Sequence, residues 1–105
     1  MFCIIYRFKV KAGKKTQFIE AWSEVTVAYK ESCGALGSRL HKSDSGEYIA
    51  YAQWPSREVR ETANLPESVT KGPVVMMREC CESIETLFEL IPIADYLVHV
   101  DAIEP

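Results

Sequence analysis

The sequence predicts a single α+β domain whose strands and helical segments follow the order β-α-β-β-α-β. Three observations lead to this prediction. They are an apolar alternation in residues 2–10, a helical apolar period in residues 14–32, and a turn signal between two strand-like runs further along the chain. The chain has 105 residues, of which 48% are hydrophobic and 26% are charged, and this composition suits one globular domain with an ordinary core.

The first strand and the first helix have the clearest patterns. Residues 2–10 are rich in β-branched and aromatic side chains, and alternation places on one face Phe2, Ile4, Tyr6, Phe8 and Val10. After a turn around Gly13, spacings of four, three and four residues predict a helix over 14–32 with an apolar face formed by Phe18, Trp22, Val25 and Tyr29. Gly34 is a typical helix stop.

A hairpin is predicted to follow the helix. Its strands are expected over 36–43 and 47–54, joined by the turn Asp44-Ser45-Gly46. Residues 56–82 are helical in composition, begin at a capping Ser56, and are interrupted at Pro66 and at Gly72-Pro73. The last strand is predicted over 83–91, with one face formed by Ile84, Thr86, Phe88 and Leu90.

This order of elements is typical of the ferredoxin-like, split β-α-β arrangement, in which helices cover one face of an antiparallel sheet. The other face would expose apolar residues from several strands, and a symmetric homodimer packed sheet against sheet would cover it. We therefore expect a domain over 1–92 and a C-terminal arm over 93–105. The arm is too apolar for a free tail, so we expect it to pack on the dimer.

Charge and hydropathy exclude several classes of partner. The chain has 15 acidic and 12 basic residues, and its net charge of −3 leaves no basic footprint for nucleic acid. No apolar run approaches the ~18 residues that span a bilayer, and the N-terminus lacks the features of a signal peptide. The sequence therefore predicts a soluble cytoplasmic protein that binds neither nucleic acid nor a membrane.

The cysteines do not form a recognisable metal or redox motif. Cys3, Cys33, Cys80 and Cys81 include no C-x-x-C pair, which a zinc site or a thioredoxin-like centre would need. We expect them to be small apolar packing residues in a reducing compartment, with no metal bound. A redox role for the adjacent pair, Cys80 and Cys81, stays open.

Several motifs resemble those of one known family. The runs Gly34-Ala35-Leu36-Gly37-Ser38-Arg39-Leu40-His41 and Tyr48-Ile49-Ala50-Tyr51-Ala52-Gln53-Trp54 resemble the antibiotic biosynthesis monooxygenase domain. The opening strand, the turn at Gly13-Lys14, and Phe18 with Ala21-Trp22 on the first helix resemble it as well. That family belongs to the dimeric α/β-barrel superfamily, and the resemblance covers roughly residues 2–91.

The resemblance implies a ferredoxin-like protomer, a dimer formed through the sheets, and a pocket between sheet and helices. Activities in the family include cofactor-free oxidation of anthrones and quinols, and haem breakdown. The haem-degrading branch uses an asparagine on the first strand, and a tryptophan and a haem-ligating histidine on the second helical segment. Here the only asparagine is Asn64, and residues 56–82 contain neither tryptophan nor histidine, so we expect no haem. No glycine-rich nucleotide loop occurs either, and we expect no cofactor.

A cofactor-free oxygenase needs a base, fixed hydrogen-bond donors for the substrate anion, and an aromatic pocket that excludes water. His41 is the candidate base, because the ordinary pKa of histidine, about 6.5, suits proton transfer at neutral pH. Tyr6 and Tyr51 are candidate donors on neighbouring central strands, so the catalytic candidates are His41, Tyr6 and Tyr51. The candidate substrate-binding residues are Arg39, on the strand face of His41, and the aromatic residues Trp22, Tyr29 and Trp54.

Three functional interpretations remain open from the sequence. The first is a cofactor-independent monooxygenase for a small aromatic substrate such as an anthrone, a quinol or a phenol. The second is a non-catalytic module that binds a small apolar ligand in the same pocket. The third is a structural dimer whose space beneath the sheet is filled by side chains, and it predicts no cavity. Arg39 and His41 could also lie on the outer face of the hairpin, bound to acidic neighbours or a backbone carbonyl.

Overall fold

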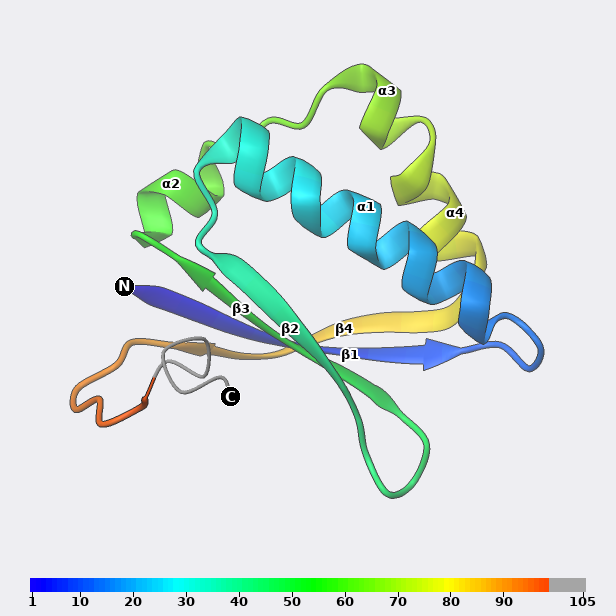
Figure 1. Cartoon of the computed structure of the whole chain (residues 1–105), viewed down its shortest axis with the longest axis horizontal. Helices are drawn as coiled ribbons and strands as arrows, with labels where there is room; N and C mark the ends of the chain where they lie inside the picture. Colours follow the sequence, from blue (N-terminus) through cyan, green and yellow to red (C-terminus); the bar gives the residue numbers. More distant parts are fainter. Residues whose placement is uncertain (99–105) are drawn as a thin grey trace, which may run out of the picture.

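The computed structural model describes residues 1–98 and has the predicted α+β, ferredoxin-like architecture (Figure 1). The elements in chain order are β1 (Phe2–Val10), α1 (Lys15–Cys33), β2 (Gly37–Lys42), β3 (Tyr48–Trp54), α2 (Arg57–Glu61), α3 (Glu67–Thr70), α4 (Pro73–Glu79) and β4 (Cys81–Leu90). The four strands form one antiparallel sheet in the order β2-β3-β1-β4, which places the first and third strands side by side at its centre.

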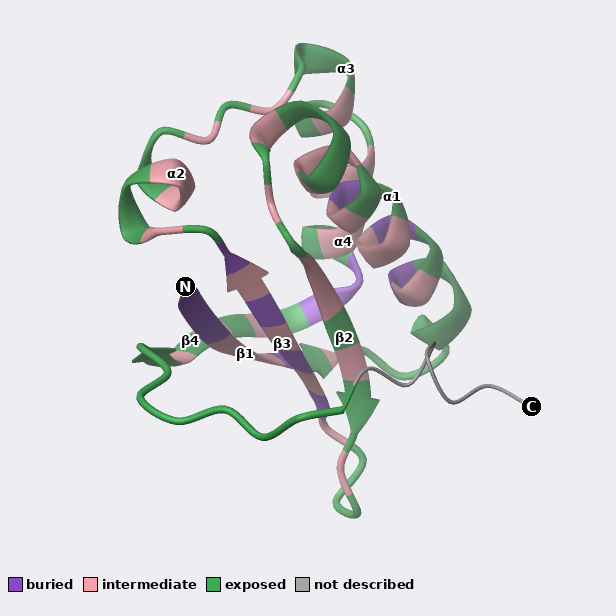
Figure 2. Cartoon of the chain, turned by 60° about the vertical axis from the view of Figure 1, so that its left-hand side comes forward, coloured by how far each residue is buried: buried purple, intermediate pink, exposed green. Residues whose placement is uncertain are grey.

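The helices lie on one face of the sheet, and the core forms between them and the strands (Figure 2). Phe8 of β1 and Phe18 of α1 pack with ring centroids 5.1 Å apart, and Tyr48 of β3 lies 5.4 Å from Phe18. A second cluster joins Phe2, Ile4 and Trp54 at the other end of the sheet. Alternate residues of β1 supply both clusters, as the period-two pattern predicts.

Local signals set the ends of the helices. The N–H of Gly34 donates to the carbonyl of Tyr29, and Gly34 adopts the left-handed conformation, with φ of 76°, that closes α1. The hydroxyl of Ser56 accepts a hydrogen bond from the N–H of Val59 at 3.2 Å and begins α2. Pro73 occupies the first turn of α4, where its missing N–H costs nothing. The second helical segment is therefore three short helices.

One prediction about the last strand is wrong. Ile84 and Thr86 pair with Phe8 and Tyr6, whereas Phe88 pairs with Ile5. A register shift between Ile5 and Tyr6 places an extra residue in β4, so that the side chains before and after it face opposite sides of the sheet. The expected common face of Ile84, Thr86, Phe88 and Leu90 is therefore split by a β-bulge.

The sheet face opposite the helices, here called the open face, is covered by no helix of residues 1–98 (Figure 1). The pairing register assigns to it Cys3, Ile5, Arg7 and Lys9 of β1, Arg39 and His41 of β2, Ile49, Tyr51 and Gln53 of β3, and Glu85, Phe88 and Leu90 of β4. The side chain of Phe88 is 60% exposed on this face. On the same face, an ion pair joins β1 and β4, in which Arg7 donates to Glu85 at 3.0 Å. The open face is thus partly apolar, as predicted.

Residues 91–98 follow β4 without regular structure. Their apolar side chains are exposed, and Tyr96 at 95% and Ile93 at 98% are almost fully so. Residues 93–98 are the first part of the predicted arm, and residues 99–105 of that arm lie outside the described residues. Within residues 1–98, no helix is both long and apolar enough to cross a membrane.

Candidate functional site

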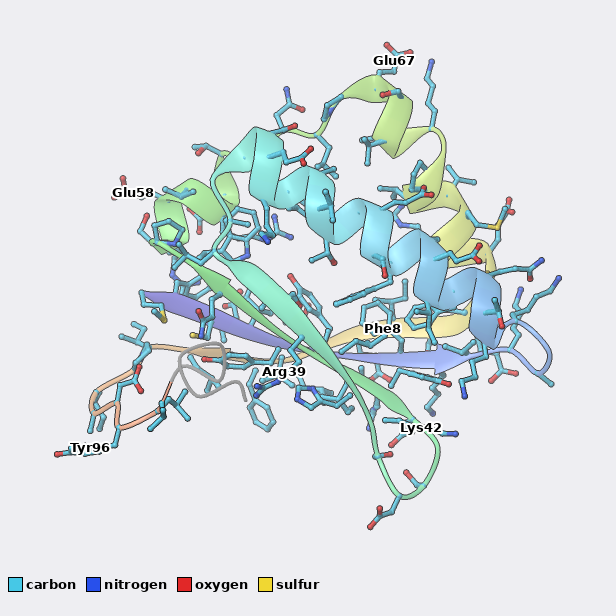
Figure 3. The ribbon with its side chains drawn as sticks, viewed as in Figure 1. Phe8, Arg39, Lys42, Glu58, Glu67 and Tyr96 are labelled. Atoms are coloured by element: carbon cyan, nitrogen blue, oxygen red, sulfur yellow. The ribbon has the colours of Figure 1, made fainter. Side chains whose placement is uncertain are left out.

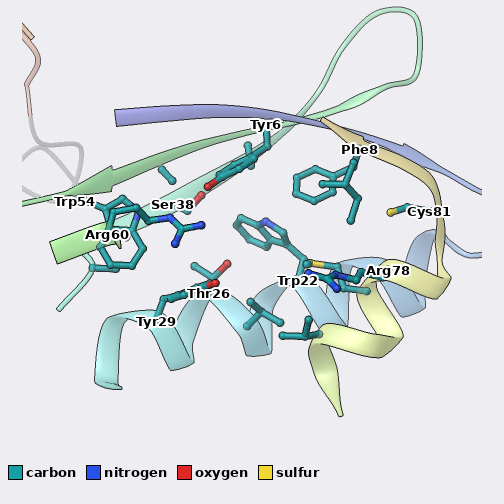
Figure 4. A pocket seen from close by; sticks show the side chains of 18 of the residues that line it. Tyr6, Phe8, Trp22, Thr26, Tyr29, Ser38, Trp54, Arg60, Arg78 and Cys81 are labelled. Carbon is teal, nitrogen blue, oxygen red and sulfur yellow. The ribbon is translucent and has the colours of Figure 1, made fainter. Parts of the chain in front are cut away.

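A cavity of about 570 Å³ lies between the sheet and the helices (Figure 4). Its size is in the range of small-molecule sites, which are about 300–1,000 Å³. Its walls come from β1, β2, β3, β4, α1, α2 and α4, so segments from most of the described chain form it. The interpretation that side chains fill this space predicted no cavity and does not agree with the structure.

The side-chain sizes on β3 create the space. The residues of β3 that face the helices are Tyr48, Ala50, Ala52 and Trp54, all buried. Two small residues lie between two large rings, so the middle of the sheet leaves a gap under α1 while its ends are filled. Ala50 and Ala52 form part of the pocket floor.

Aromatic side chains line much of this cavity. Tyr6 and Phe8 project into it from β1, and Trp22 and Tyr29 project into it from α1 on the opposite side (Figure 4). Tyr29 meets Trp54 edge to face, with ring centroids 5.4 Å apart. Burial raises the pKa of the Tyr29 hydroxyl, and Arg60 opposes that effect, so Tyr29 is neutral near pH 7.

Arg60 of α2 is the main pocket residue that the sequence analysis missed. Its guanidinium carbon lies 5.4 Å from the ring centroid of Trp54 and 5.7 Å from that of Tyr29. Figure 4 shows it pointing into the cavity toward the hydroxyl end of Tyr6. Burial of the guanidinium lowers its pKa, but Tyr6, Tyr29 and Cys33 outweigh burial, and the pKa of Arg60 is raised.

Hydroxyl groups gather at one end of the pocket, and the other end, where Phe8, Arg78 and Cys81 lie, is mixed in character (Figure 4). Ser38, Thr26 and Tyr6 bring hydroxyl groups near Arg60 (Figure 4). The rest of the lining is mostly apolar, with Phe8, Val25, Val74, Met77 and Ile84, and it also includes the polar residues Arg78, Glu82 and Ser83. Such an arrangement can hold a ring in the apolar part and orient its oxygen-bearing edge toward Tyr6 and Arg60.

Four of the seven predicted site residues line the cavity. They are Tyr6, Trp22, Tyr29 and Trp54. The two tryptophans and Tyr29 were predicted to contact substrate, and Tyr6 to donate to it, and their placement around one cavity is compatible with these roles. The helical stripe of α1 and the alternation of β1 are the signals that identified them.

The other three predicted residues, Arg39, His41 and Tyr51, lie on the open face by their pairing and do not line the cavity. Figure 3 shows Arg39 on the side of the sheet away from α1. Arg39 Nε donates to His41 Nε2 at 2.9 Å, and His41 Nδ1 lies 3.1 Å from the carbonyl oxygen of Ile49. Because Nε2 accepts a hydrogen bond, Nδ1 carries the proton and donates to that carbonyl. The outer-face alternative for Arg39 and His41 therefore describes their placement.

Tyr51 and Tyr6 project from opposite faces of the sheet. Tyr6 pairs with Ala50, and Tyr51 pairs with Ile5, so the two tyrosines lie on neighbouring strands but on opposite faces. The hydroxyl of Tyr51 lies 3.3 Å from the thiol of Cys3. This contact is the main reason that the pKa of Tyr51 is raised, and Asp95 of the arm adds a smaller contribution.

Cys81 is the one cysteine among the described pocket-lining residues. Burial raises the pKa of its thiol to about 11, and the neighbouring Cys80 adds to the effect. The thiolate form is therefore scarce at neutral pH, which disfavours a nucleophilic role. Among the described residues, no cluster of three or more histidine, cysteine or acidic side chains could hold a metal ion.

The fold and the cavity together define a small ferredoxin-like domain with a ligand-sized pocket between its sheet and its helices. A sequence profile then identifies the family. The chain belongs to the antibiotic biosynthesis monooxygenase family, whose profile matches residues 1–62. The match covers β1 to α2 and so includes most of the aromatic pocket wall. No curated protein sequence matches the chain closely enough to count as a relative.

Solved structures share the fold at low sequence identity. SnoaB, a cofactor-independent oxygenase from Streptomyces nogalater, is 13% identical, with a TM-score of 0.74 over 90% of this chain and 95% of that one. Rv0793 from Mycobacterium tuberculosis is also 13% identical, with a TM-score of 0.69 over 91% of this chain and 98% of that one. At these identities the likeness concerns the fold alone.

Proposed function

We propose that the protein is a cofactor-independent monooxygenase that oxidises a small aromatic substrate, such as an anthrone, a quinol or a phenol, in the cavity beneath the sheet. One observation carries this proposal: the Tyr6 hydroxyl and the Arg60 guanidinium converge inside an otherwise mostly apolar, aromatic pocket. Family membership and the oxygenase activity of SnoaB, which shares the fold, also support it.

In such a reaction the protein has only to accept a proton from the substrate and to stabilise the resulting anion. The substrate loses a proton, and its anion gives one electron to dioxygen. The resulting superoxide and substrate radical join through a new carbon–oxygen bond, and the protonated peroxide then loses water. For an anthrone, the methylene carbon loses two hydrogens and gains one oxygen atom as a ketone, while the second oxygen atom leaves as water.

The pocket residues have separate roles in this proposal. Tyr6 donates a hydrogen bond to the anionic oxygen of the substrate, and Arg60 stabilises its charge. Trp22, Tyr29 and Trp54 hold the ring and exclude water. Glu82, the one carboxylate among the described lining residues, is the candidate proton acceptor. His41, Arg39 and Tyr51 take no part, because their side chains lie on the open face.

The direct test is oxygen consumption. Metal-stripped protein is incubated with a panel of anthrones, quinols and electron-rich phenols, and dissolved oxygen is followed with an electrode. We expect uptake that requires folded protein and disappears after heat denaturation. Uptake that depends on added metal, or none with any member of the panel, would contradict the proposal.

A non-catalytic ligand-binding module is the second candidate. It is favoured by the placement of the predicted base, His41, outside the pocket, which leaves one carboxylate and no histidine among the described lining residues. This function predicts that aromatic ligands raise the melting temperature without oxygen uptake. The two candidates therefore differ in a single measurement made on the same ligand set.

A homodimer packed through the open face completes the proposal. The exposed Phe88 and the exposed apolar side chains of residues 91–98 support it, because a monomer would leave them in water. The dimer places the two open faces together and leaves the cavities on the outer, helical sides. Each protomer then has a complete pocket of its own.

A further inference from the structure

We infer that the natural substrate of this pocket carries a carboxylate or a similar oxyanion on its aromatic ring, and that Arg60 binds that group. The inference concerns the same site and rests on the proposed function for the nature of the ring. It adds a charge requirement that an anthrone, a quinol or a simple phenol does not have.

The first step compares the arginines that form ion pairs with carboxylates and those that do not. Of the arginines outside the pocket, Arg7 and Arg57 bind Glu85 at 3.0 Å and Glu89 at 3.1 Å. Arg39, exposed on the open face, donates to His41 and forms no ion pair with the described residues. Arg60 and Arg78 line the pocket, and neither forms an ion pair with any residue in the described part of the chain. The chain has an acidic balance of 15 to 12, so carboxylates are plentiful, yet both pocket cations lack one.

The second step separates Arg60 from Arg78. Arg78 is exposed, so water solvates its charge, whereas Arg60 is half-buried. Arg60 stacks near the rings of Trp54 and Tyr29, which hold its guanidinium in place through their π-faces. These contacts stabilise the charged guanidinium, but among the described residues no carboxylate forms an ion pair with it. An anionic ligand supplies the missing partner.

The third step concerns the shape of the guanidinium group and of the cavity around it. A guanidinium presents parallel N–H donors that match the two oxygens of a carboxylate, and the resulting charge-assisted hydrogen bonds are short and strong. The hydroxyl groups of Tyr6, Ser38 and Thr26 lie around the same end of the cavity (Figure 4). The part of the cavity beyond Trp22, which Phe8 lines and where the exposed Arg78 also lies, receives the ring (Figure 4). Arg60 and the three hydroxyl groups thus converge on the end of the cavity where the carboxylate of an aromatic ligand would lie.

The test uses two ligands that differ only in charge. Anthraquinone-2-carboxylate and its neutral carboxamide share their rings and cannot be oxidised further at the reacting positions. Both tryptophans of the chain, Trp22 and Trp54, line the cavity, so quenching of their fluorescence reports binding directly. We expect the wild-type protein to bind the carboxylate roughly 10- to 100-fold more tightly than the carboxamide.

Three variants assign this preference to one residue. Arg60→Gln should remove it, and Arg60→Lys, which keeps the charge without the planar fork, should retain part of it. Arg57→Gln removes a positive charge from the same helix outside the pocket and should leave the preference intact. Circular dichroism checks that each variant is folded. Equal binding of the two ligands by wild-type protein, or loss of the preference in Arg78→Gln instead of Arg60→Gln, would overturn the inference.

Oxygen uptake separates this inference from the proposed function. If the preference for the carboxylate is present but no hydroquinone is oxidised, the anion site stands and the oxygenase proposal fails. If neutral and carboxylated hydroquinones are oxidised with equal kcat/KM, the oxygenase stands and the anion site is wrong. If neither anthraquinone quenches the fluorescence of folded protein, the anion site is wrong as well.

Discussion

Tyr6 and Tyr51 lie on neighbouring strands, but their side chains face opposite sides of the sheet. Both are central-strand tyrosines, and the sequence identifies both as candidate hydrogen-bond donors to the substrate. Register decides between them, because Tyr6 pairs with buried Ala50 beneath α1 while Tyr51 pairs with Ile5 on the open face. A side chain one position away along a strand faces the other side of the sheet. The chemical role of a tyrosine in this domain thus depends on a register of one residue.

The placement of Tyr6 and Tyr51 on opposite faces of the sheet gives a matched pair of substitutions. Tyr6→Phe removes one hydroxyl from the pocket, and we expect kcat/KM for oxygen uptake to fall about 100-fold, in the range seen when one donor to a developing oxyanion is lost. Tyr51→Phe removes the same group from the open face, and we expect no change in kcat/KM. An equal loss of activity in both variants would refute the assignment of the donor to Tyr6.

Cys81 gives a prediction about stability at high pH. Burial raises the pKa of its thiol from an ordinary 9.0 to about 11 in the folded protein. Between these values the unfolded chain releases the proton and the folded chain keeps it, so unfolding becomes easier as the pH rises. The stabilising contribution is complete below pH 9 and is lost as the pH passes through 11.

Urea denaturation between pH 8 and pH 11 measures this contribution. The free energy of unfolding of wild-type protein should fall more steeply above pH 9 than that of Cys81→Ala, which has no thiol at that position. Lysines and tyrosines titrate in both proteins, so the comparison removes their effect. Parallel curves for the two proteins would show that the Cys81 thiol is not perturbed by folding.

At the scale of elements, the sequence was sufficient for the fold. Period-two runs, the stripe of α1 and the turn at Gly46 are local patterns, and each of these segments forms within one or two residues of its predicted bounds. The bulge in β4 was not predictable, because an extra residue in one strand depends on its partner. Phe88 consequently faces the opposite side from Thr86.

The site was predictable only in part for the same reason. Trp22 and Tyr29 lie on the helical stripe and were found from local spacing. Arg60 was missed because α2 is a five-residue helix whose direction over the sheet is a tertiary property. The alternation of Ala50 and Ala52 between Tyr48 and Trp54 was the available signal for a cavity, since small residues on a buried strand face leave room above it.

The short helix α2 gives a prediction of its own, because Ser56 caps the helix that carries Arg60. Ser56→Ala removes the acceptor for the Val59 N–H, and we expect the free energy of unfolding to fall by about 1 kcal/mol. Because Arg60 lies one turn further on, binding of anthraquinone-2-carboxylate should weaken as well. Urea denaturation and tryptophan quenching measure the two effects.

Ser32→Ala is the control for that substitution, since Ser32 is exposed near the end of α1 and does not line the cavity. It should change neither stability nor binding by a measurable amount. If Ser56→Ala lowers stability while carboxylate binding stays at the wild-type level, the cap does not position Arg60, and the orientation of α2 is set by its packing on Trp54 and Tyr29.

At the scale of the whole molecule, the two faces of the sheet have different surroundings. The helical face encloses the cavity and is complete within one chain. The open face has exposed Phe88, and residues 91–98 leave further apolar side chains in water. Soluble monomers seldom expose large contiguous apolar patches, so a second copy is the simplest cover. The expected dimer would therefore stabilise the sheet that forms the floor of each pocket.

Analytical ultracentrifugation tests this argument. We expect wild-type protein at micromolar concentration to sediment as a dimer of about twice 11.9 kDa. Phe88→Asp places a charge in the apolar contact and should weaken dimerisation by roughly 100-fold or more. Val27→Asp makes a similar change at an exposed apolar residue of α1, 47% accessible, and should leave the dimer intact. A monomeric wild-type protein, or dissociation by Val27→Asp alone, would place the interface elsewhere.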